Sequence, residues 1–262
     1  MDQAHSTHPA LQLLEELPQR FAKPRSAGLT MVMDKGLSFA DAESFIENAS
    51  PFTDFVKFGW STGLFNRRLK DKIKLYKDAD IRCYLGGTLF EIYAVRQQVT
   101  EFKLLVESLE LDTVEISDGS LDMPHDRKCE FIADFRRDFN VLSEVGSKDA
   151  DKIIAPYRWI AMMKAELSAG SELVIAEARE AGNVGIFRST GEVRSGLVEE
   201  ILTQIPSEKI LWEAPNKAQQ TWFIRMQGAN VSLGNIAPSE VIPLETLRLG
   251  LRSDTFEKFL GR

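Results

Sequence analysis

The sequence predicts a single (β/α)8 TIM barrel of the α/β class with a short N-terminal extension. From residue 29 onward, strand-length apolar runs alternate with longer stretches of helical periodicity, and eight such units can be counted. Repeated βα units are typical of a parallel sheet covered by helices. Eight units in about 230 residues fit a closed barrel better than an open doubly wound sheet, which is the rival fold.

The strands are predicted from short apolar and β-branched runs bounded by turn-forming residues. In chain order they cover Leu29–Met33, Phe55–Phe58, Ile81–Leu85, Thr113–Ser117, Val141–Val145, Leu173–Ala176, Ile210–Trp212 and Val231–Leu233. The helices between them are predicted from apolar residues that recur every three or four positions. They cover Phe39–Asn48, Asn66–Lys77, Glu91–Leu109, Arg127–Asp138, Asp151–Ala169, Ser195–Gln204 and Lys217–Gln227.

Capping residues support several of these helix boundaries. Ser38 is a good N-cap, and Asp149 or Ala150 precedes a segment that begins with acidic residues. Gly170 and Gly228 follow predicted helix ends, where glycine closes a helix in the left-handed conformation.

No linker-like run of Pro, Gly or Ser divides the chain. We therefore expect an N-terminal extension over residues 1–22 and a barrel catalytic domain over residues 23–262. The extension is predicted to be partly helical, with a short helix over Leu11–Leu17 that covers the bottom of the barrel.

The composition is that of an ordinary globular protein and excludes several classes of partner. With 44% hydrophobic and 27% charged residues, a net charge of −7 and a pI near 5.2, the chain lacks the basic surface that nucleic acids or anionic membranes require. It has no apolar run of membrane-spanning length and no apolar signal region at the N-terminus. Two cysteines, Cys83 and Cys129, are too few for a disulfide framework, so we expect reduced thiols in a cytoplasmic protein.

Four of the predicted strands end at a glutamate, and this recurrence is the main functional signal in the sequence. Glu115, Glu144, Glu177 and Glu213 follow one another at separations of 29, 33 and 36 residues. A charged group at the end of a buried strand costs stability unless something polar meets it. The carboxyl ends of barrel strands carry the active site, so we expect these glutamates to converge there.

Cations follow the same strand ends. Lys57 lies in the second strand, Lys148 follows the fifth and Arg179 follows the sixth. If the glutamates point inward, their mutual repulsion raises their pKa values unless the lysines or a divalent cation neutralise them. Mg²⁺ suits such an oxygen-rich site, because it is commonly held by one or two carboxylates together with substrate phosphate.

Structural explanations compete with this interpretation. A single strand-end glutamate is more often a partner in a structural ion pair than a metal ligand. Gly86-Gly87-Thr88 fits a tight turn as well as a phosphate-binding loop. The basic run from Arg67 to Lys74 is most simply a solvated helix face.

At these strand ends the chain resembles the phosphosulfolactate synthase family, which also includes plant heat-stress-associated relatives. The resemblance extends from Lys23 to Thr255 in ordered blocks: Lys23-Pro24-Arg25, Asp34-Lys35-Gly36-Leu37, Val56-Lys57-Phe58-Gly59-Trp60, Gly86-Gly87-Thr88-Leu89-Phe90-Glu91, Val114-Glu115-Ile116-Ser117-Asp118-Gly119, Glu144-Val145-Gly146 with Lys148-Asp149, Glu177-Ala178-Arg179-Glu180, Glu213-Ala214-Pro215, Leu233-Gly234-Asn235-Ile236 and Gly250-Leu251-Arg252-Ser253-Asp254-Thr255.

The resemblance implies a Mg²⁺-dependent addition of sulfite to phosphoenolpyruvate, giving (2R)-O-phospho-3-sulfolactate by carbon–sulfur bond formation. Such a product serves coenzyme M formation or the synthesis of other sulfonates. Lys148 is the expected general acid, in cationic surroundings that would lower its pKa. Candidate metal ligands or lysine-orienting groups are Glu115, Glu144 and Glu177. Candidate substrate contacts are Lys57, Arg179, Gly234 and Asn235, with phosphate near the last two because barrels commonly bind phosphate at their last strands.

Two alternatives stay open at this point. The barrel could act on another phosphorylated carboxylic acid, because a barrel alone does not determine the reaction. The chain could also be a non-catalytic, stress-associated member of the family. Small molecules are the expected partners, and exposed apolar helix faces are compatible with a homo-oligomer.

Overall fold

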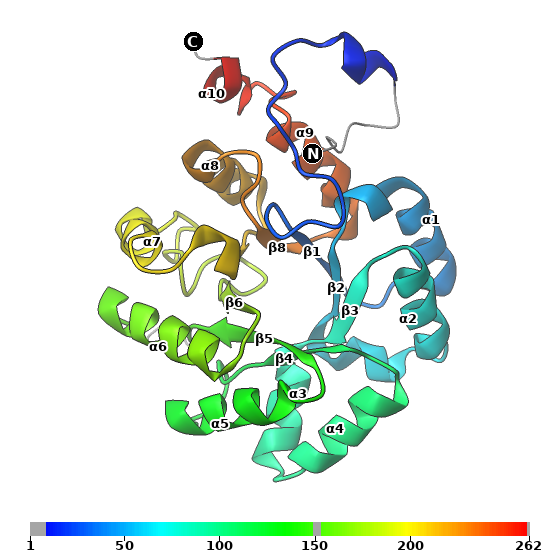
Figure 1. Ribbon diagram of the computed structural model, residues 1–262, viewed down its shortest axis with the longest axis vertical. Helices are drawn as coiled ribbons and strands as arrows, with labels where there is room; N and C mark the ends of the chain where they lie inside the picture. Colours follow the sequence, from blue (N-terminus) through cyan, green and yellow to red (C-terminus); the bar gives the residue numbers. More distant parts are fainter. Residues whose placement is uncertain (1–8, 149–152, 261–262) are drawn as a thin grey trace.

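Eight parallel strands form one barrel-shaped sheet in the computed structural model, which describes residues 9–148 and 153–260. The strands are β1 (Thr30–Asp34), β2 (Phe55–Phe58), β3 (Arg82–Leu85), β4 (Thr113–Ile116), β5 (Asn140–Val145), β6 (Leu173–Ala176), β7 (Ile210–Glu213) and β8 (Leu233–Ile236). Their hydrogen-bonded order is β3-β2-β1-β8-β7-β6-β5-β4. The helices surround the sheet (Figure 1), which confirms the predicted (β/α)8 barrel.

The barrel closes at two different kinds of junction. The first and last strands, β1 and β8, pair in parallel, so both ends of the sequence meet in the sheet. β3 and β4 stand at the ends of the hydrogen-bonded order. Side chains bridge this seam, because the Arg82 guanidinium donates to Thr113 Oγ1 over 3.3 Å.

Seven of the eight predicted strands match the observed ones to within one residue, but the last does not. It was predicted over Val231–Leu233 and instead covers Leu233–Ile236. Gly234 and Asn235 are rare in strands, and the sequence therefore suggested a loop. In the barrel, glycine is needed at position 234 because a Cβ there would lie 2.9 Å from Met31 Cε.

The observed helices and 3-10 helices surround the sheet in chain order. They are η1 (Pro9–Leu13), α1 (Phe39–Ala49), η2 (Ser50–Phe52), η3 (Gly59–Phe65), α2 (Leu69–Asp78), α3 (Gly87–Val95), α4 (Val99–Ser108), α5 (His125–Phe135), α6 (Pro156–Ala169), α7 (Ser195–Leu202), η4 (Ser207–Lys209), α8 (Lys217–Gln227), η5 (Pro238–Glu240), α9 (Val241–Arg248) and α10 (Phe256–Leu260). No helix of the described ranges is both long and apolar enough to cross a bilayer.

The predicted helix boundaries are correct where a cap marks them. Ser38 forms a capping box with Asp41 at the start of α1, and Gly170 and Gly228 close α6 and α8 with positive φ. The single helix predicted over Glu91–Leu109 is wrong: α3 and α4 replace it, and Gln97 between them has a φ of 58°. Helices α9 and α10 were not predicted.

Two predictions fall partly outside the described residues. The proposed cap at Asp149 or Ala150 and the first two residues of the helix predicted over Asp151–Ala169 are not described, and α6 begins at Pro156.

In the N-terminal extension, the helix predicted over Leu11–Leu17 is a shorter 3-10 turn. Leu13 in this turn is 83% exposed, so the turn does not cover the barrel bottom.

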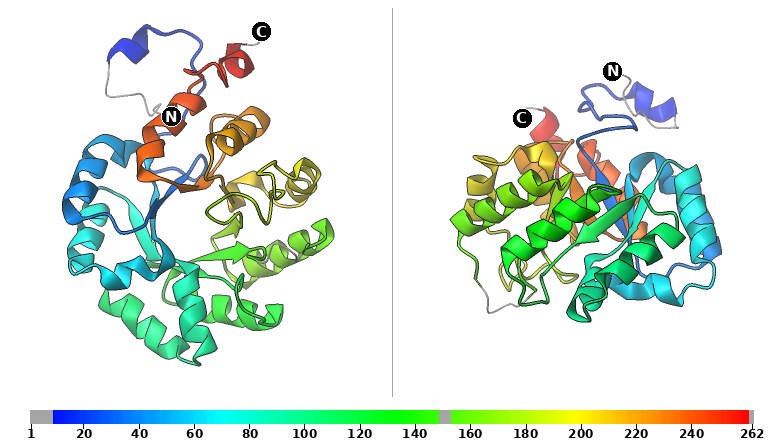
Figure 2. Two further views of the ribbon diagram at one scale, coloured as in Figure 1. Left: turned by 180° about the vertical axis from the view of Figure 1, so that it is seen from behind. Right: turned by 60° about the horizontal axis from the view of Figure 1, so that its bottom comes forward.

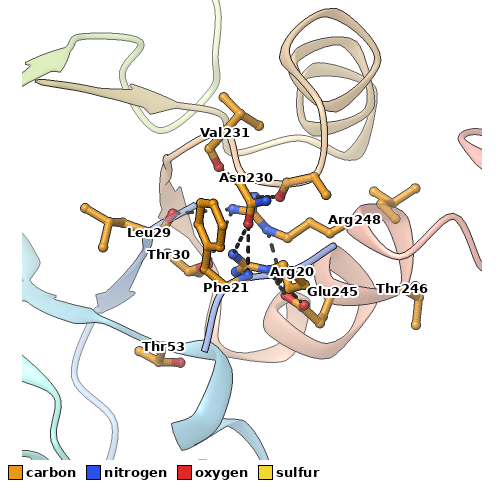
Figure 3. Close-up of polar contacts among 12 residues, drawn as sticks. Arg20, Phe21, Leu29, Thr30, Thr53, Asn230, Val231, Glu245, Thr246 and Arg248 are labelled. Carbon is orange, nitrogen blue, oxygen red and sulfur yellow. Dashed lines mark hydrogen bonds and ion pairs between the residues drawn. The ribbon is translucent and has the colours of Figure 1, made fainter. Parts of the chain in front are cut away.

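A buried charged network instead ties Arg20 and Phe21 to the amino-terminal ends of the strands (Figure 3). Arg20 Nε donates to Glu245 Oε1 over 2.9 Å, and Arg20 also donates to the side chain of Asn230. The Arg248 guanidinium donates to the carbonyl oxygens of Ala229 and Val231. We call Arg20, Glu245 and Arg248 the bottom cluster. It fastens the start of the fold to α9, beside which η1 and α10 project (Figures 1 and 2).

The apolar core has two layers, one between sheet and helices and one inside the barrel. The inner layer consists of Leu29, Met31, Met33, Phe55, Tyr84, Leu142, Leu173, Ile175 and Leu211. Successive strand residues face opposite sides of the sheet, so a residue two positions after an inner one also faces inward. This alternation directs Glu144, Glu177 and Glu213 to the barrel interior, because they follow Leu142, Ile175 and Leu211 by two positions.

Candidate active site

A cavity of about 710 Å³ opens at the carboxyl ends of the strands. Polar side chains from six strands or the loops that follow them line it, and apolar contacts come from Met33 and Trp60. The lining comprises Met33, Lys57, Trp60, Gly86, Thr88, Glu144, Lys148, Glu177, Arg179, Glu180, Ala181, Asn183, Glu213 and Asn235. Most of the candidate residues from the sequence therefore share one space, but Glu115 and Gly234 do not line it.

Lys57 is the central counter-charge of the buried glutamates. Its ammonium lies 2.9 Å from Glu115 Oε1, 3.3 Å from Glu144 Oε2 and 3.9 Å from Glu213 Oε1. These carboxylates raise the pKa of Lys57 well above its usual value, against the opposing effect of burial. Lys57 therefore stays charged and joins strands β2, β4, β5 and β7 across the barrel interior.

Lys148 forms a second, more open centre above the first. Its ammonium lies 3.2 Å from Glu144 Oε1, 3.5 Å from Glu91 Oε1 and 3.9 Å from Glu177 Oε2. The side chain is 18% exposed. Burial alone would lower the pKa of Lys148, but Glu144, Glu177 and Glu91 raise it above its usual value. The expected cationic surroundings and lowered pKa are therefore wrong.

Glu91 is a site residue that the sequence analysis did not single out. It lies in α3, is 2% exposed, and accepts a 2.6 Å hydrogen bond from Ser117 Oγ in addition to facing Lys148. The sequence predicted a helix that begins at Glu91. In the structure α3 begins four residues earlier, at Gly87, so Glu91 lies within the helix on its inner side. The sequence signal that could have identified Glu91 as a site residue is its position, five residues after Gly86.

The crowded carboxylates differ in pKa. Glu213 has a pKa raised to about 7, first by burial and then by Glu144 and Glu115, against the opposing effect of Lys57. Burial also raises the pKa of Glu177 well above the usual value, with Glu144 and Glu213 adding to it. Glu144 is the exception, because Lys148 and Lys57 lower its pKa against the effect of burial. The site therefore combines ionised and protonated carboxyl groups near neutral pH.

Glu115 lies deeper than the other glutamates and supports the barrel seam. It is fully buried and pairs in register with Leu142, two residues before Glu144. Besides its ion pair with Lys57, its Oε1 accepts a 2.6 Å hydrogen bond from the backbone N–H of Gly87. A side chain at position 87 would collide with Glu115 and Ser117, which explains the glycine. Glu115 thus joins β4 to the start of α3.

Arg179 and Asn235 meet on the opposite side of the cavity. Asn235 Nδ2 donates to the carbonyl oxygen of Arg179 over 3.1 Å, and Glu177 Oε1 accepts from the Arg179 N–H over 2.5 Å. Gly234, predicted as a substrate contact, instead packs inside the barrel against Met31 and Leu211.

Two further buried ion pairs support the site from outside. Lys128 in α5 pairs with Glu166 over 2.7 Å and donates to the carbonyl oxygen of Glu144 over 2.5 Å. Lys72 in α2 pairs with Asp34 at the end of β1. Lys72 is fully buried, so the solvated face predicted for the basic run does not hold there.

The residues present are chemically suited to Mg²⁺, although they do not form a complete ligand set. Within the described residues, no group of three or more Asp, Glu, His or Cys side chains is arranged to hold a metal ion. Buried Glu177 Oε2, Glu91 Oε2 and Glu115 Oε2 nevertheless have no hydrogen-bond partner in these ranges. Mg²⁺ commonly needs only one or two protein carboxylates, with water and substrate oxygens completing its coordination.

A second cavity, of about 700 Å³, lies at the opposite end of the barrel. Charged residues also line it, but Arg25 pairs with Asp54 and Arg82 with Glu172, both over less than 3 Å. The two cavities have nearly the same volume. The cavity at the carboxyl ends differs in its coupled glutamates and in its cations shared between several carboxylates.

Known proteins of one family are similar to this chain over most of its length. The family model described as (2R)-phospho-3-sulfolactate synthase (ComA) matches residues 18–254. Phosphosulfolactate synthase of Bacillus subtilis is 44% identical over 244 residues, covering 92% of this chain and 97% of the relative. Phosphosulfolactate synthase of Methanothermobacter thermautotrophicus is 42% identical over 247 residues, covering 92% and 96%.

More distant similarities concern a plant protein and the fold. Protein HEAT-STRESS-ASSOCIATED 32 of Arabidopsis thaliana is 23% identical over 265 residues, covering 89% of this chain and 90% of the relative. The crystal structure of 3-hexulose-6-phosphate synthase from Salmonella typhimurium aligns with a TM-score of 0.55 at 12% identity, covering 86% of this chain and all of that one. At this identity the structural likeness concerns the barrel alone.

Proposed function

The chain belongs to the (2R)-phospho-3-sulfolactate synthase family, and on this premise we propose that it adds sulfite to phosphoenolpyruvate, giving (2R)-O-phospho-3-sulfolactate. The observation that carries the proposal is the ammonium of Lys148, which lines the cavity and is held by carboxylates from three different elements. That arrangement positions a proton donor where a small anionic substrate would bind.

The reaction needs one bond-forming step and one proton transfer. The sulfur lone pair of sulfite attacks the methylene carbon C3, and the π electrons of the substrate move through C2 onto its carboxylate. The resulting carbanion takes a proton at C2, which completes the product without a leaving group. Lys148 supplies this proton, because its raised pKa keeps the ammonium charged at neutral pH. Its partial exposure allows reprotonation from water.

Lys57 has a supporting role in this proposal. Its ammonium lies between three glutamates and stays charged, so it limits the repulsion that the carboxylates exert on anionic substrates. Arg179 is the cavity-lining cation that offers a planar fork to an anionic oxygen pair. The two substrates are both anions, and these cations reduce the free energy cost of bringing them together.

Mg²⁺ is part of the proposal. Glu144 and Glu177 line the cavity and are the carboxylates that would hold it, whereas Glu115 lies below the cavity and orients Lys57. When bound, Mg²⁺ would stabilise negative charge on the substrate carboxylate during the addition. The chain's contribution is the carboxylate pair of Glu144 in β5 and Glu177 directly after the adjacent strand β6.

The deciding experiment mixes the protein with phosphoenolpyruvate, sulfite and Mg²⁺ and follows the phosphosulfolactate adduct by mass spectrometry. We expect the adduct only when all components are present. EDTA should stop its formation and added Mg²⁺ should restore it. Full activity in EDTA would remove the metal from the proposal, and no adduct under any condition would overturn the reaction itself.

Both cysteines are free thiols, and one of them, Cys83, is buried. Because thiols persist in reducing compartments, this supports our proposal that the reaction takes place in the cytoplasm.

A further inference from the structure

We propose that Asn235 is a positioning residue that acts through Arg179, holding it in place so that its guanidinium binds the phosphate group of the substrate. This assignment rests on the proposed function and deepens it. It gives Asn235 an indirect role in place of the direct substrate contact expected from the sequence.

The backbone of Arg179 is fixed from both sides. Its N–H donates to Glu177 Oε1, and its carbonyl oxygen accepts from Asn235 Nδ2 over 3.1 Å and from the Gly182 N–H over 3.3 Å. Glu177 and Asn235 are 2% and 6% exposed, so both anchors sit in the rigid rim of the barrel. The loop after β6 is therefore attached to β8, across β7.

The side chain of Arg179 is free, in contrast to its backbone. Within residues 9–148 and 153–260, its guanidinium makes neither a hydrogen bond nor an ion pair, although it lines the cavity. Lys57 and Lys148, the other cavity-lining cations identified above, are each shared between carboxylates. A fixed backbone with an unpaired planar guanidinium is suited to an incoming anion that accepts two parallel hydrogen bonds.

The backbone conformation supports a ligand-directed role. Arg179 and Asn235 both have φ near 57°, a left-handed conformation that non-glycine residues adopt at a cost in free energy. Of the six other such residues among those described, Asp80, Gln97 and Glu110 simply close helices α2, α3 and α4, and Trp60 and Ser61 form the kink inside η3. Arg179 and Asn235 close no helix, and they contact each other at the cavity.

Phosphate is the anion that this position favours. Asn235 lies in β8, one of the two strands after which barrels commonly bind phosphate, and it holds the backbone of Arg179 beside that strand. A phosphate monoester also offers the paired oxygens that bidentate arginine recognises.

A double-mutant cycle tests the assignment through calorimetric binding of phosphoenolpyruvate with Mg²⁺ and no sulfite, so that no turnover occurs. We expect Arg179→Met to weaken binding about 10- to 100-fold, because it removes a charge-assisted hydrogen bond. Asn235→Gly removes the amide but tolerates the left-handed backbone, and we expect about a 3- to 10-fold loss. The double variant should bind no more weakly than Arg179→Met alone.

Each outcome decides between the alternatives. Losses that multiply in the double variant, or an unchanged affinity in Asn235→Gly, would overturn the positioning role. Failure of the wild-type protein to bind phosphoenolpyruvate would instead overturn the proposed function. Steady-state kinetics supply a second readout: Asn235→Gly should raise KM for phosphoenolpyruvate far more than it lowers kcat. Asn48→Ala, an exposed amide in α1, is the matched control and should leave both unchanged.

Thermal unfolding of each variant separates binding from folding. If Asn235→Gly does not fold, Asn235→Ser carries the same test, because its shorter side chain keeps a polar group but loses the reach of the amide. An additive result with that variant would equally overturn the assignment.

Discussion

Charged side chains are buried at both ends of this barrel, but the two groups are built differently. In the bottom cluster, the Arg248 guanidinium is enclosed and donates to backbone carbonyl oxygens, and Glu245 pairs with Arg20. At the carboxyl ends, glutamates outnumber the lysines that pair with them, and several of their oxygens lack a hydrogen-bond donor among the described residues. The bottom cluster also holds two nitrogens without a hydrogen-bond acceptor in the described ranges, Arg20 Nη2 and Arg248 Nε, but it lines neither of the two cavities described above. It therefore stabilises the fold, whereas the carboxylate oxygens without a donor beside the cavity are prepared for a ligand.

The largest expected effect is a loss of turnover, and it concerns the carboxyl end of the barrel. Lys148→Ala should lower turnover about 100- to 10,000-fold, because it removes the proposed proton donor. Far-UV circular dichroism should remain native, since Lys148 is partly exposed at the mouth. Lys74→Ala, on the exposed face of α2, is the control and should keep full turnover. Near-normal turnover in Lys148→Ala would remove this residue from the mechanism.

The second effect is a loss of unfolding free energy, and it concerns the bottom cluster. Arg248→Met should lower the free energy of unfolding by about 3–5 kcal/mol, because it breaks a buried ionic network and leaves carbonyl oxygens without donors. Urea unfolding measures the loss. The exposed Arg225→Met should change stability by no more than about 0.5 kcal/mol. A loss below about 1 kcal/mol for Arg248→Met would contradict the structural role of the bottom cluster.

A third effect depends on pH and belongs to the carboxyl end alone. The pKa of Glu213 is about 7 in the folded protein and about 4.3 in an unfolded chain. Between these values the folded state holds the proton more tightly, so the contribution of Glu213 to stability falls as pH rises and is restored as pH falls.

Replacing this carboxyl should therefore stabilise the protein above neutral pH. Glu213→Gln should be about 1–3 kcal/mol more stable than the wild type at pH 8 and should gain nothing near pH 4.5. Urea unfolding in EDTA at both pH values measures this, since the chelator removes any contribution from bound metal. An equal difference at both pH values would show that Glu213 does not titrate as stated.

The smallest effect concerns the rim. Lys35, directly after β1, pairs over 2.9 Å with Glu180, which lines the cavity, but both side chains are partly exposed. Solvent screens such a pair, so Lys35→Met should cost no more than about 1 kcal/mol of unfolding free energy. A loss approaching that of Arg248→Met would show that the rim, like the bottom cluster, holds the barrel together.

The strands at the carboxyl end could be predicted from sequence because their signal is local. Apolar runs defined seven strands, and alternation within them brought the glutamates to one place. The same local view failed at Gly234 and Asn235, where packing against Met31 overrides strand propensity. It failed again at Gln97, whose left-handed backbone divides one periodic segment into two helices.

The electrostatic behaviour of the site could not be predicted in the same way. The pKa of Lys148 depends on Glu91 and Glu177, which approach it only in the folded barrel. The bottom cluster was missed for a related reason, since Arg20 and Glu245 carry no local pattern that links them. Sequence spacing therefore identified which residues share a strand end, and the three-dimensional arrangement determines their charge.

The contact between Arg20 and Glu245 has a consequence for how this chain folds. The two residues are separated by 225 positions in sequence. A ribosome releases the amino-terminal part first, so Arg20 and the edge of β1 that pairs with β8 wait for their partners until Glu245 and β8 have emerged. Contacts between such distant segments slow folding, because a long loop must close before they form. The barrel is completed only once β8 is available, and until then its early strands have an edge open to chaperones or to neighbouring chains.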